Sequence, residues 1–246
     1  MFTLHKGDSL PFLKSLPDKS IDLIATDPQY GIGADKKNAH SSIRDNDEWE
    51  NFGWDDSRPE KEYFDECLRV AKFCAFWGGN YFADMLPPSP AWLIWRKPEA
   101  ETGFSLADVE LCWTNGKFTA RMITLPRRDG NLHPTQKPLS LMNWTIEKFK
   151  LPKGAKVLDP FMGSGTTGES ALLLGYEFIG IEKIAKYHAI AKKRLQQAVL
   201  SPSFYTLPNN RLHMDAGDSP RQPSQSTLEG FTPAEQGSTP AQLPLM

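Results

Sequence analysis

A glycine-rich turn between a predicted strand and a predicted helix constrains the fold of this chain more than any other feature. The apolar run KVLDPF predicts a strand, and Gly163, Gly165 and Gly168 follow it in GxGxxG spacing. The segment TTGESALLLG then predicts a helix that ends at Gly175, and Glu182 closes the next predicted strand. Glycines at this spacing permit a tight turn and close approach of a ligand, and the acid can bind ribose hydroxyls. The chain is therefore expected to bind a nucleotide-like cofactor at the end of a parallel sheet.

Strand-like and helix-like segments alternate along residues 1–200, which predicts an α/β fold. The runs IDLIAT, FCAFWGG, AWLIWRK and FSLADVELCWT predict strands, and PEKEYFDECLRVAK has the apolar spacing of a helix. We expect one Rossmann-like domain over residues 1–200, with three layers (α/β/α) and a mostly parallel sheet. The segment 201–246 is rich in Pro, Ser and Gln and cannot bury enough apolar surface to fold. It is expected to be a disordered or extended tail.

Two classes of cofactor are compatible with the glycine turn. Its spacing is that of nicotinamide- and flavin-binding proteins, so an oxidoreductase is one interpretation, although the substrate-binding half of such an enzyme is not evident in the sequence. Asp159, however, lies just before the glycines at the carboxyl end of the strand, where a carboxylate would repel a pyrophosphate. The sulfonium and ammonium groups of S-adenosylmethionine are cations, so Asp159 and Glu182 together favour that cofactor.

A second motif follows the strand IDLIAT and consists of Asp27, Pro28, Gln29 and Tyr30. Here the chain resembles the β-class DNA amino-methyltransferases, whose catalytic motif is Asp/Asn/Ser-Pro-Pro-Tyr/Phe/Trp. Three further motifs of that family match in the expected order: GDS at 7–9, HPTQKP at 133–138 and DPFMGSGTT at 159–167. The catalytic motif precedes the cofactor motif, which is the circularly permuted order of the β class. The resemblance covers most of residues 1–200 and implies a methyltransferase fold that uses S-adenosylmethionine.

The resemblance implies a catalytic role for the segment 27–30. An exocyclic amine is a weak nucleophile because its lone pair is delocalised into the ring. The Asp27 carboxylate and the Pro28 carbonyl would accept hydrogen bonds from the amine, and Tyr30 would stack on a base flipped out of the duplex. Transfer then depends mostly on positioning and needs no cysteine nucleophile. Gln29 departs from the family, where a second proline is usual, and is expected to make the turn less rigid.

The resemblance also implies which residues bind the cofactor. Asp8 would approach the adenine end, Lys137 would suit the methionine carboxylate, and Phe161 would form a wall of the pocket. The expected cofactor-binding set is Asp8, Thr135, Lys137, Asp159, Pro160, Phe161, Gly163, Ser164, Gly165, Thr166, Thr167 and Glu182. His133 is expected to orient its turn rather than to transfer protons.

Double-stranded DNA is the expected partner, although the formal net charge is −2. Residues 117–156 carry nine lysines and arginines against two acidic residues, so one face can still be basic. We expect DNA contacts from insertions 31–59 and 115–131, with Arg121, Arg127 and Arg128 on phosphates or guanines. Trp49 and Trp54 are the tryptophans expected near DNA, and the others are expected in the core.

The sequence constrains the identity of the methylated base less strongly than the fold and the cofactor. Aspartate at the first motif position is typical of adenine-N6 enzymes, and cytosine N4 is the alternative. A DNA-binding protein that lost turnover through Gln29 is a second alternative, and RNA or protein-glutamine methylation is a third.

The cysteines form no CxxC pair, which fits a reducing compartment. Without a signal-peptide core or an apolar span, a cytoplasmic protein without membrane contact is expected. By analogy, a homodimer and a role in restriction–modification are further expectations.

Overall fold

The computed structural model describes residues 1–33, 53, 55–98, 107–127 and 137–200. The chain divides into two compact units, Met1–Thr206 and Leu207–Met246, and the second lies outside the described residues. The expected tail at 201–246 and most of insertion 31–59 therefore lie outside them as well. Within the part that is described, no helix combines the length and the apolar character that a membrane span requires.

The described residues form eight strands in one sheet and five α-helices. The strands are β1 (Phe2–Lys6), β2 (Ile21–Thr26), β3 (Ala71–Trp77), β4 (Trp92–Arg96), β5 (Val109–Thr114), β6 (Arg121–Thr124), β7 (Lys156–Asp159) and β8 (Glu177–Glu182). The helices are α1 (Ser9–Ser15), α2 (Lys61–Val70), α3 (Leu139–Glu147), α4 (Thr166–Leu173) and α5 (Ala185–Leu200), and a short 3-10 helix, η1 (Gly79–Tyr81), follows β3.

The sheet is mostly parallel, as the alternating pattern predicts. Its strand order is β1-β8-β7-β2-β3-β5-β4-β6. The pairs from β1 through β8, β7 and β2 to β3 are all parallel, and β4 is parallel to β6. β5 is antiparallel to both of its neighbours, β3 and β4. The carboxyl ends of seven strands therefore share one edge of the sheet with the first residues of β5.

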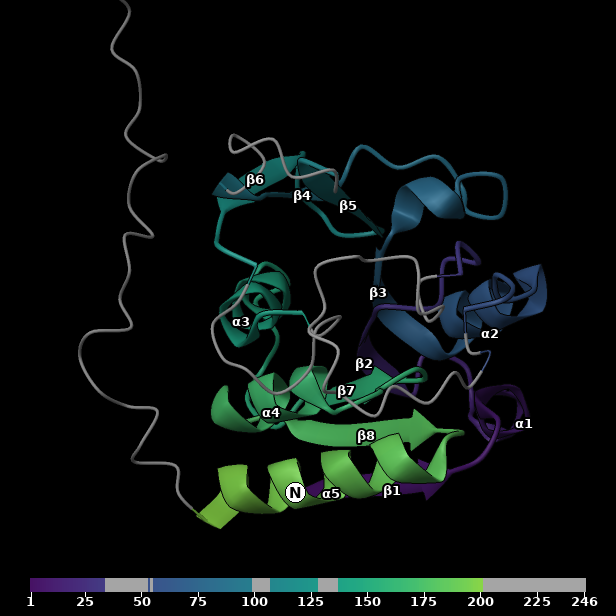
Figure 1. Ribbon diagram of the computed structural model, residues 1–246, viewed down its shortest axis with the longest axis vertical. Coiled ribbons are helices and arrows are strands. Elements are labelled where there is room, and N and C mark those ends of the chain that lie inside the picture. The colour runs from purple at the N-terminus through teal and green to yellow at the C-terminus, as the bar shows by residue number, and fades with distance from the viewer. Residues whose placement is uncertain (34–52, 54, 99–106, 128–136, 201–246) are drawn as a thin grey trace, which may run out of the picture. The chain divides into compact units, whose positions relative to one another are not determined.

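Apolar side chains on the two faces of the sheet form two separate cores. Leu23 of β2 is in register with Val157 of β7, which pairs with Phe178 of β8, and all three pack with residues of α3, α4 and α5. The next position along β2 and β7, Ile24 and Leu158, packs on the other face with residues of α1 and α2. Figure 1 shows α1 and α2 on one side of β2 and β3, with α3 and α4 on the other. The predicted three-layer α/β/α arrangement is confirmed.

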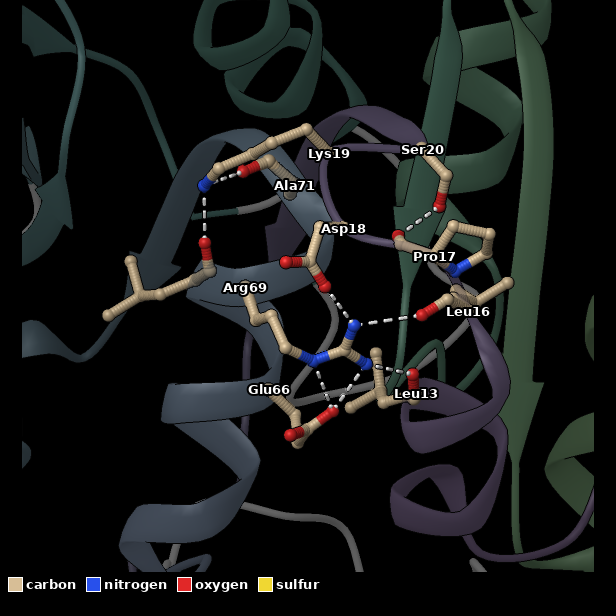
Figure 2. Close-up of polar contacts among 10 residues, drawn as sticks. Leu13, Leu16, Pro17, Asp18, Lys19, Ser20, Glu66, Arg69 and Ala71 are labelled. Carbon is tan, nitrogen blue, oxygen red and sulfur yellow. Dashed lines mark hydrogen bonds and ion pairs between the residues drawn. The ribbon is translucent and has the colours of Figure 1, made fainter.

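Arg69 of α2 joins the carboxyl ends of α1 and α2 (Figure 2). Its Nη atoms donate to the carbonyl oxygens of Leu16 at 2.9 Å and Leu13 at 3.1 Å, which are carbonyls at the end of α1. The same guanidinium pairs with Asp18 at 2.6 Å and Glu66 at 2.7 Å. Arg69 thus supplies a donor for the Leu16 carbonyl and a second donor for the Leu13 carbonyl, which already accepts from the amide of Leu16 at 3.0 Å, and it locks α1 against α2.

Two elements, α3 and β6, are not predicted by the sequence pattern. α3 buries Leu141, Met142, Trp144, Thr145 and Ile146, so its apolar residues do not follow the spacing of a one-sided helix. β6 has only four residues, three of them exposed, which leaves little alternation to detect. The predicted strand FSLADVELCWT is also shortened, because β5 begins only at Val109.

Candidate active site

The sheet brings four predicted carboxylates to one edge. β1 leads into Asp8 and β2 into Asp27, while Asp159 ends β7 and Glu182 ends β8. These strands are parallel neighbours, so their carboxyl ends lie side by side, where α/β proteins bind their ligands. Because β5 is antiparallel, Glu110 near its start reaches the same edge. Sequence reasoning places the first four residues in the site and overlooks Glu110.

Asp27 is the centre of a network of hydrogen bonds and ion pairs. The Tyr30 hydroxyl donates to Oδ1 of Asp27 at 2.5 Å, and the Lys137 ammonium donates to Oδ2 at 2.6 Å. Lys137 also lies 3.2 Å from the Tyr30 hydroxyl oxygen and 5.6 Å from the centroid of its ring. The ammonium expected at the methionine carboxylate of the cofactor is thus in contact with the predicted catalytic carboxylate.

Glu110 and Lys97 extend this network. The Lys137 ammonium lies 2.9 Å from Oε2 of Glu110, and Oε1 of Glu110 pairs with the Lys97 ammonium. Lys97 follows β4, its side chain is only 6 % exposed, and its ammonium lies over the Trp95 ring. The result is a row of alternating charges that runs from Lys97 through Glu110 and Lys137 to Asp27. A lysine just after one strand and a glutamate near the start of the next are a weak sequence signal, because such charges are commonly solvated.

The charged groups in this row shift one another's pKa values and so determine which of them are ionised. Burial alone would raise the pKa of Glu110, but the Lys137 and Lys97 ammonium groups lower it to about 2. Burial alone would lower the pKa of Lys137, but Asp27 and Glu110 raise it above its usual value. Burial raises the pKa of Asp27, and the charge of Lys137 offsets part of that effect. At neutral pH the row therefore contains a carboxylate at Glu110 and an ammonium at Lys137.

The ring of Tyr30 is held by aromatic neighbours and by the space at a glycine. It stacks on Tyr81 with a centroid distance of 4.7 Å and meets the edge of Phe82. Gly78, directly after β3, has φ +73°, and a Cβ at that position would lie 2.1 Å from Cε1 of Tyr30. Glycine is needed at Gly78 both for the backbone conformation and for the close approach of the ring.

The backbone of the catalytic segment is anchored by Asp55. Its Oδ1 accepts hydrogen bonds from the amide of Tyr30 at 2.8 Å and from the amide of Gly31 at 2.9 Å. Asp55 is buried, with 1 % of its surface exposed, although it belongs to the polar stretch after the motif. Sequence reasoning gives no role to Asp55, since one acid among many in that stretch carries no distinguishing signal. It holds the turn that contains Gln29, where the family usually has a rigid proline.

The glycine turn has the predicted strand–turn–helix geometry. Gly163 and Gly165 have φ values of +51° and +87°, which only glycine adopts readily. Glu182 accepts hydrogen bonds from the amides of Gly163 at 3.0 Å and Ile184 at 2.7 Å. A Cβ added at Gly163 would meet no atom within 4 Å, so the turn borders open space.

Asp159 is a buried carboxyl next to this turn. Its Oδ1 accepts from the Thr26 hydroxyl at 2.6 Å and from the amide of Phe161 at 3.0 Å, and Thr167 also hydrogen-bonds the side chain. Burial raises the pKa of Asp159 to about 6, although the hydrogen bonds from Thr26, Thr167 and Phe161 act to lower it. A buried carboxyl with this pKa favours a cation beside it, because a positive charge would stabilise the ionised form.

Asp8 and Phe161 come close together through Tyr63 of α2. Oδ1 of Asp8 caps α1 by accepting from the amide of Leu10 at 2.9 Å, and it also accepts from the Tyr63 hydroxyl at 2.6 Å. The Tyr63 ring lies against Phe161 with a centroid distance of 5.5 Å. Tyr63, which sequence analysis assigns only to an apolar helix face, therefore links two predicted cofactor residues.

The threonine at the start of α4 is joined to α5. Arg194 of α5 donates to the Thr166 hydroxyl at 3.0 Å and pairs with the buried carboxylate of Glu169. At Gly165, a Cβ would lie 3.0 Å from that of Ala191, which brings α5 against the turn. The cofactor turn is thus fixed to α5 by an ion pair and by close packing.

The remaining predicted site residues fall into three groups: arginines at β6, residues of the glycine turn, and residues outside the described ranges. Arg121 begins β6 and therefore lies at the edge of the sheet opposite Asp27, whereas Arg127 follows the carboxyl end of β6. Pro160 and Ser164 belong to the turn between β7 and α4. Arg128, His133, Thr135, Trp49 and Trp54 lie outside the described residues.

Comparison with known proteins identifies relatives of this chain. The family model described as DNA methylase (N6_N4_Mtase) matches residues 88–193. The chain is 30 % identical over 253 aligned residues to the Type II methyltransferase M.HinfI of Haemophilus influenzae, covering 82 % of this chain and 70 % of the relative.

Solved structures show a related fold. The crystal structure of the M1.HpyAVI–SAM complex has a TM-score of 0.54 and 25 % identity, covering 79 % of this chain and 99 % of that one. The PvuII DNA methyltransferase, described as cytosine-N4-specific, has a TM-score of 0.53 at 16 % identity, covering 82 % of this chain and 92 % of that one, and shares the fold.

Proposed function

The chain belongs to the DNA amino-methyltransferase family, and from this premise we propose that it methylates the N6 amino group of adenine in duplex DNA. The methyl donor of this family is S-adenosylmethionine, which is bound in the M1.HpyAVI complex. The observation that carries the proposal is the position of Asp27, which directly follows β2 at the edge of the sheet where the neighbouring strand β7 leads into the glycine turn. An acceptor amine on Asp27 would lie next to a cofactor bound at that turn.

The residues at the turn suit S-adenosylmethionine. Asp159 is buried and favours a cation, Glu182 lies beside the glycine amides, and the space at Gly163 is open. When bound, the cofactor supplies an electrophilic methyl group on a cationic sulfur. We propose that Asp159, Pro160, Phe161 and the turn at 163–167 enclose it, that Glu182 binds the ribose, and that Asp8 borders the adenine.

Methyl transfer requires the protein to position the amine rather than to form a covalent bond with the base. The Asp27 carboxylate would accept one N–H of the amine and the Pro28 carbonyl the other, which makes the nitrogen lone pair available. Tyr30 would stack on the flipped base, since its ring is already fixed by Tyr81 and by its hydroxyl bond to Asp27. The hydrogen bonds that the amides of Tyr30 and Gly31 donate to Asp55 support this arrangement, because they fix the backbone that Gln29 alone would leave free to rotate.

Cytosine N4 methylation is the alternative, because the same fold serves the cytosine-specific PvuII enzyme. Aspartate at position 27 favours adenine by resemblance only. Arg127 supports a DNA contact on the catalytic side, since it follows the carboxyl end of β6, and Arg128 is proposed to act with it. Arg121 begins β6 at the opposite edge and would reach only DNA that wraps around the sheet.

The direct test is tritiated methyl transfer from S-adenosylmethionine to unmethylated duplex DNA, followed by mass spectrometry of the nucleosides. N6-methyladenine that disappears in an Asp27→Ala variant is the expected result. Detection of N4-methylcytosine instead would support the proposed methyl transfer and identify cytosine, rather than adenine, as the target base. Cofactor binding without any incorporation into DNA would overturn the proposal and favour a DNA-binding protein without turnover.

A further inference from the structure

We propose that Glu110, held by Lys97, is a positioning residue for methyl transfer. It retains the Lys137 ammonium when the acceptor amine replaces that ammonium on Asp27. This inference rests on the proposed function, because it assumes that Asp27 accepts a hydrogen bond from the amine.

Both oxygens of Asp27 already have a donor in the structure. The Tyr30 hydroxyl donates to Oδ1 at 2.5 Å, and Lys137 donates to Oδ2 at 2.6 Å. A carboxylate only accepts hydrogen bonds, so an incoming amine competes with these two donors. Tyr30 is held in place by its stack on Tyr81 and by the close approach to Gly78. Lys137 is an N–H donor at the end of a flexible side chain, so it is the donor that the amine replaces.

Lys137 needs another partner once it leaves Asp27. Its side chain is only 10 % exposed, and a buried ammonium without a counter-ion is strongly unfavourable. An ammonium has three donors, and Lys137 has three acceptors within reach: Asp27 at 2.6 Å, Glu110 at 2.9 Å and the Tyr30 hydroxyl at 3.2 Å. After release from Asp27 it keeps the other two, and Glu110 supplies the balancing charge.

Lys97 makes Glu110 suitable for this role. It pairs with Oε1 of Glu110, so that Oε2 faces Lys137. The Lys97 ammonium is itself held over the Trp95 ring. Glu110 is therefore fixed by a cation on its far side and does not have to move to receive Lys137.

The first test is a charge-neutral substitution that keeps the shape of the side chain. In single-turnover methyl transfer with excess DNA and saturating S-adenosylmethionine, Glu110→Gln is expected to be at least tenfold slower than wild type. Its dissociation constant for S-adenosylmethionine should change by less than twofold. Glu110→Asp, which restores the charge, should be at least threefold faster than Glu110→Gln. A Glu110→Gln rate within twofold of wild type, or no rescue by Glu110→Asp, would overturn the inference.

Glu66→Gln is the matched control. The Glu66 side chain is 19 % exposed and pairs with Arg69, while that of Glu110 is 22 % exposed and pairs with lysines. Glu66 lies in α2 away from Asp27 and Lys137, so its substitution should leave the rate within twofold of wild type. An equal loss in both variants would mean that any broken ion pair slows the enzyme, and would also overturn the inference.

The second test does not depend on activity. Asp27→Asn, Glu110→Gln and the double variant are compared by thermal unfolding. Each single variant leaves Lys137 one carboxylate, and the double variant leaves it none. The fall in melting temperature of the double variant is therefore expected to exceed the sum of the two single falls. Additive or smaller losses would show that the two acids do not share Lys137.

The two tests separate failure of the inference from failure of the proposed function. A wild-type protein that methylates no DNA would overturn the proposed function and, with it, the role of Glu110 in transfer. An active wild type whose Glu110→Gln variant is equally fast would overturn the inference alone.

Discussion

The ammonium of Lys137 lies 2.6 Å from Oδ2 of Asp27, although 110 residues separate them along the chain. Asp27 follows β2, and Lys137 lies two residues before α3. The contact joins the HPTQKP element to the DPQY motif, so two motifs that are distant in sequence form one site. Changes on either side of this contact, or in the residues that support it, should therefore alter methyl transfer.

Replacing Asp27 by alanine should remove the acceptor that holds the amine. We expect Asp27→Ala to slow single-turnover transfer about a hundred- to a thousandfold, the range seen when one preorganised hydrogen-bonding group is removed from an active site. Affinity for S-adenosylmethionine, measured by calorimetry, should stay within twofold, because Asp159 and Glu182 are unchanged. A variant that retains a tenth of the wild-type rate would contradict this role.

Gly78→Ala should displace the Tyr30 ring, and Gly154→Ala provides a control with the same backbone conformation. Both glycines have φ +73°, so each alanine costs about 1 to 2 kcal/mol of backbone strain. Only at Gly78 does the new Cβ meet Tyr30, whereas at Gly154 it meets no atom within 4 Å. Gly78→Ala should therefore lower both the methyl-transfer rate and the melting temperature more than Gly154→Ala. Similar rates in the two variants would show that the position of the Tyr30 ring is unimportant.

Asp55→Ala should loosen the catalytic turn. It removes the acceptor of two half-buried hydrogen bonds, from the amides of Tyr30 and Gly31, each worth about 0.5 to 1.5 kcal/mol in stability. We expect a rate at least tenfold below wild type, together with a lower melting temperature. The neighbouring Asp56 is exposed, so Asp56→Ala should change neither quantity appreciably. Equal rates for the two variants would rule out the anchoring role of Asp55.

Asp159→Asn should make the protein more stable at neutral pH while weakening cofactor binding. The pKa of Asp159 is raised from its usual 3.8 to about 6 in the folded protein. The folded state therefore binds this proton more tightly than the unfolded state, and the stability of the wild type falls as the pH rises from about 4 to about 6. Asparagine has no proton to lose, so the gain of the variant should approach about 3 kcal/mol above pH 6 and vanish near pH 4.

Chemical denaturation at pH 4, 6 and 7.5 measures this difference. Calorimetry at pH 7.5 should show at least a tenfold weaker affinity of the variant for S-adenosylmethionine, because the cationic cofactor loses its carboxylate. If the variant is less stable than wild type at pH 7.5, the ionised form of Asp159 does not lower the free energy of unfolding, which contradicts the prediction.

Gln29→Pro should make the catalytic turn more rigid. Proline restricts the unfolded chain and orders the turn before the base arrives, effects worth about 0.4 to 1 kcal/mol where the backbone accepts it. The melting temperature is therefore expected to rise, while single-turnover transfer should stay within about twofold of wild type, because Asp55 already fixes the backbone of the turn. A slower variant with an unchanged melting temperature would indicate that the glutamine side chain or its amide has a function of its own.

Local sequence is sufficient to predict the fold class and to place the proposed site residues at the carboxyl ends of their strands. Period-2 and continuous apolar runs indicated most strands, and the glycines at 163, 165 and 168 indicated the cofactor turn, because φ values near +51° and +87° require glycine. α3 was not predicted, since it is buried on several sides and so lacks one-sided spacing. β6 is too short to show a period.

The contacts among site residues were decided by the tertiary structure. The sequence by itself determined that Asp27, Asp159 and Glu182 lie at the carboxyl ends of strands in a parallel sheet, because hydrophobic periodicity and turn chemistry are local properties. The order of the strands determined that the antiparallel β5 delivers Glu110 to that edge and that Lys137 bridges it to Asp27. Such pairings join residues far apart in the chain through packing and charge, and no local pattern encodes them.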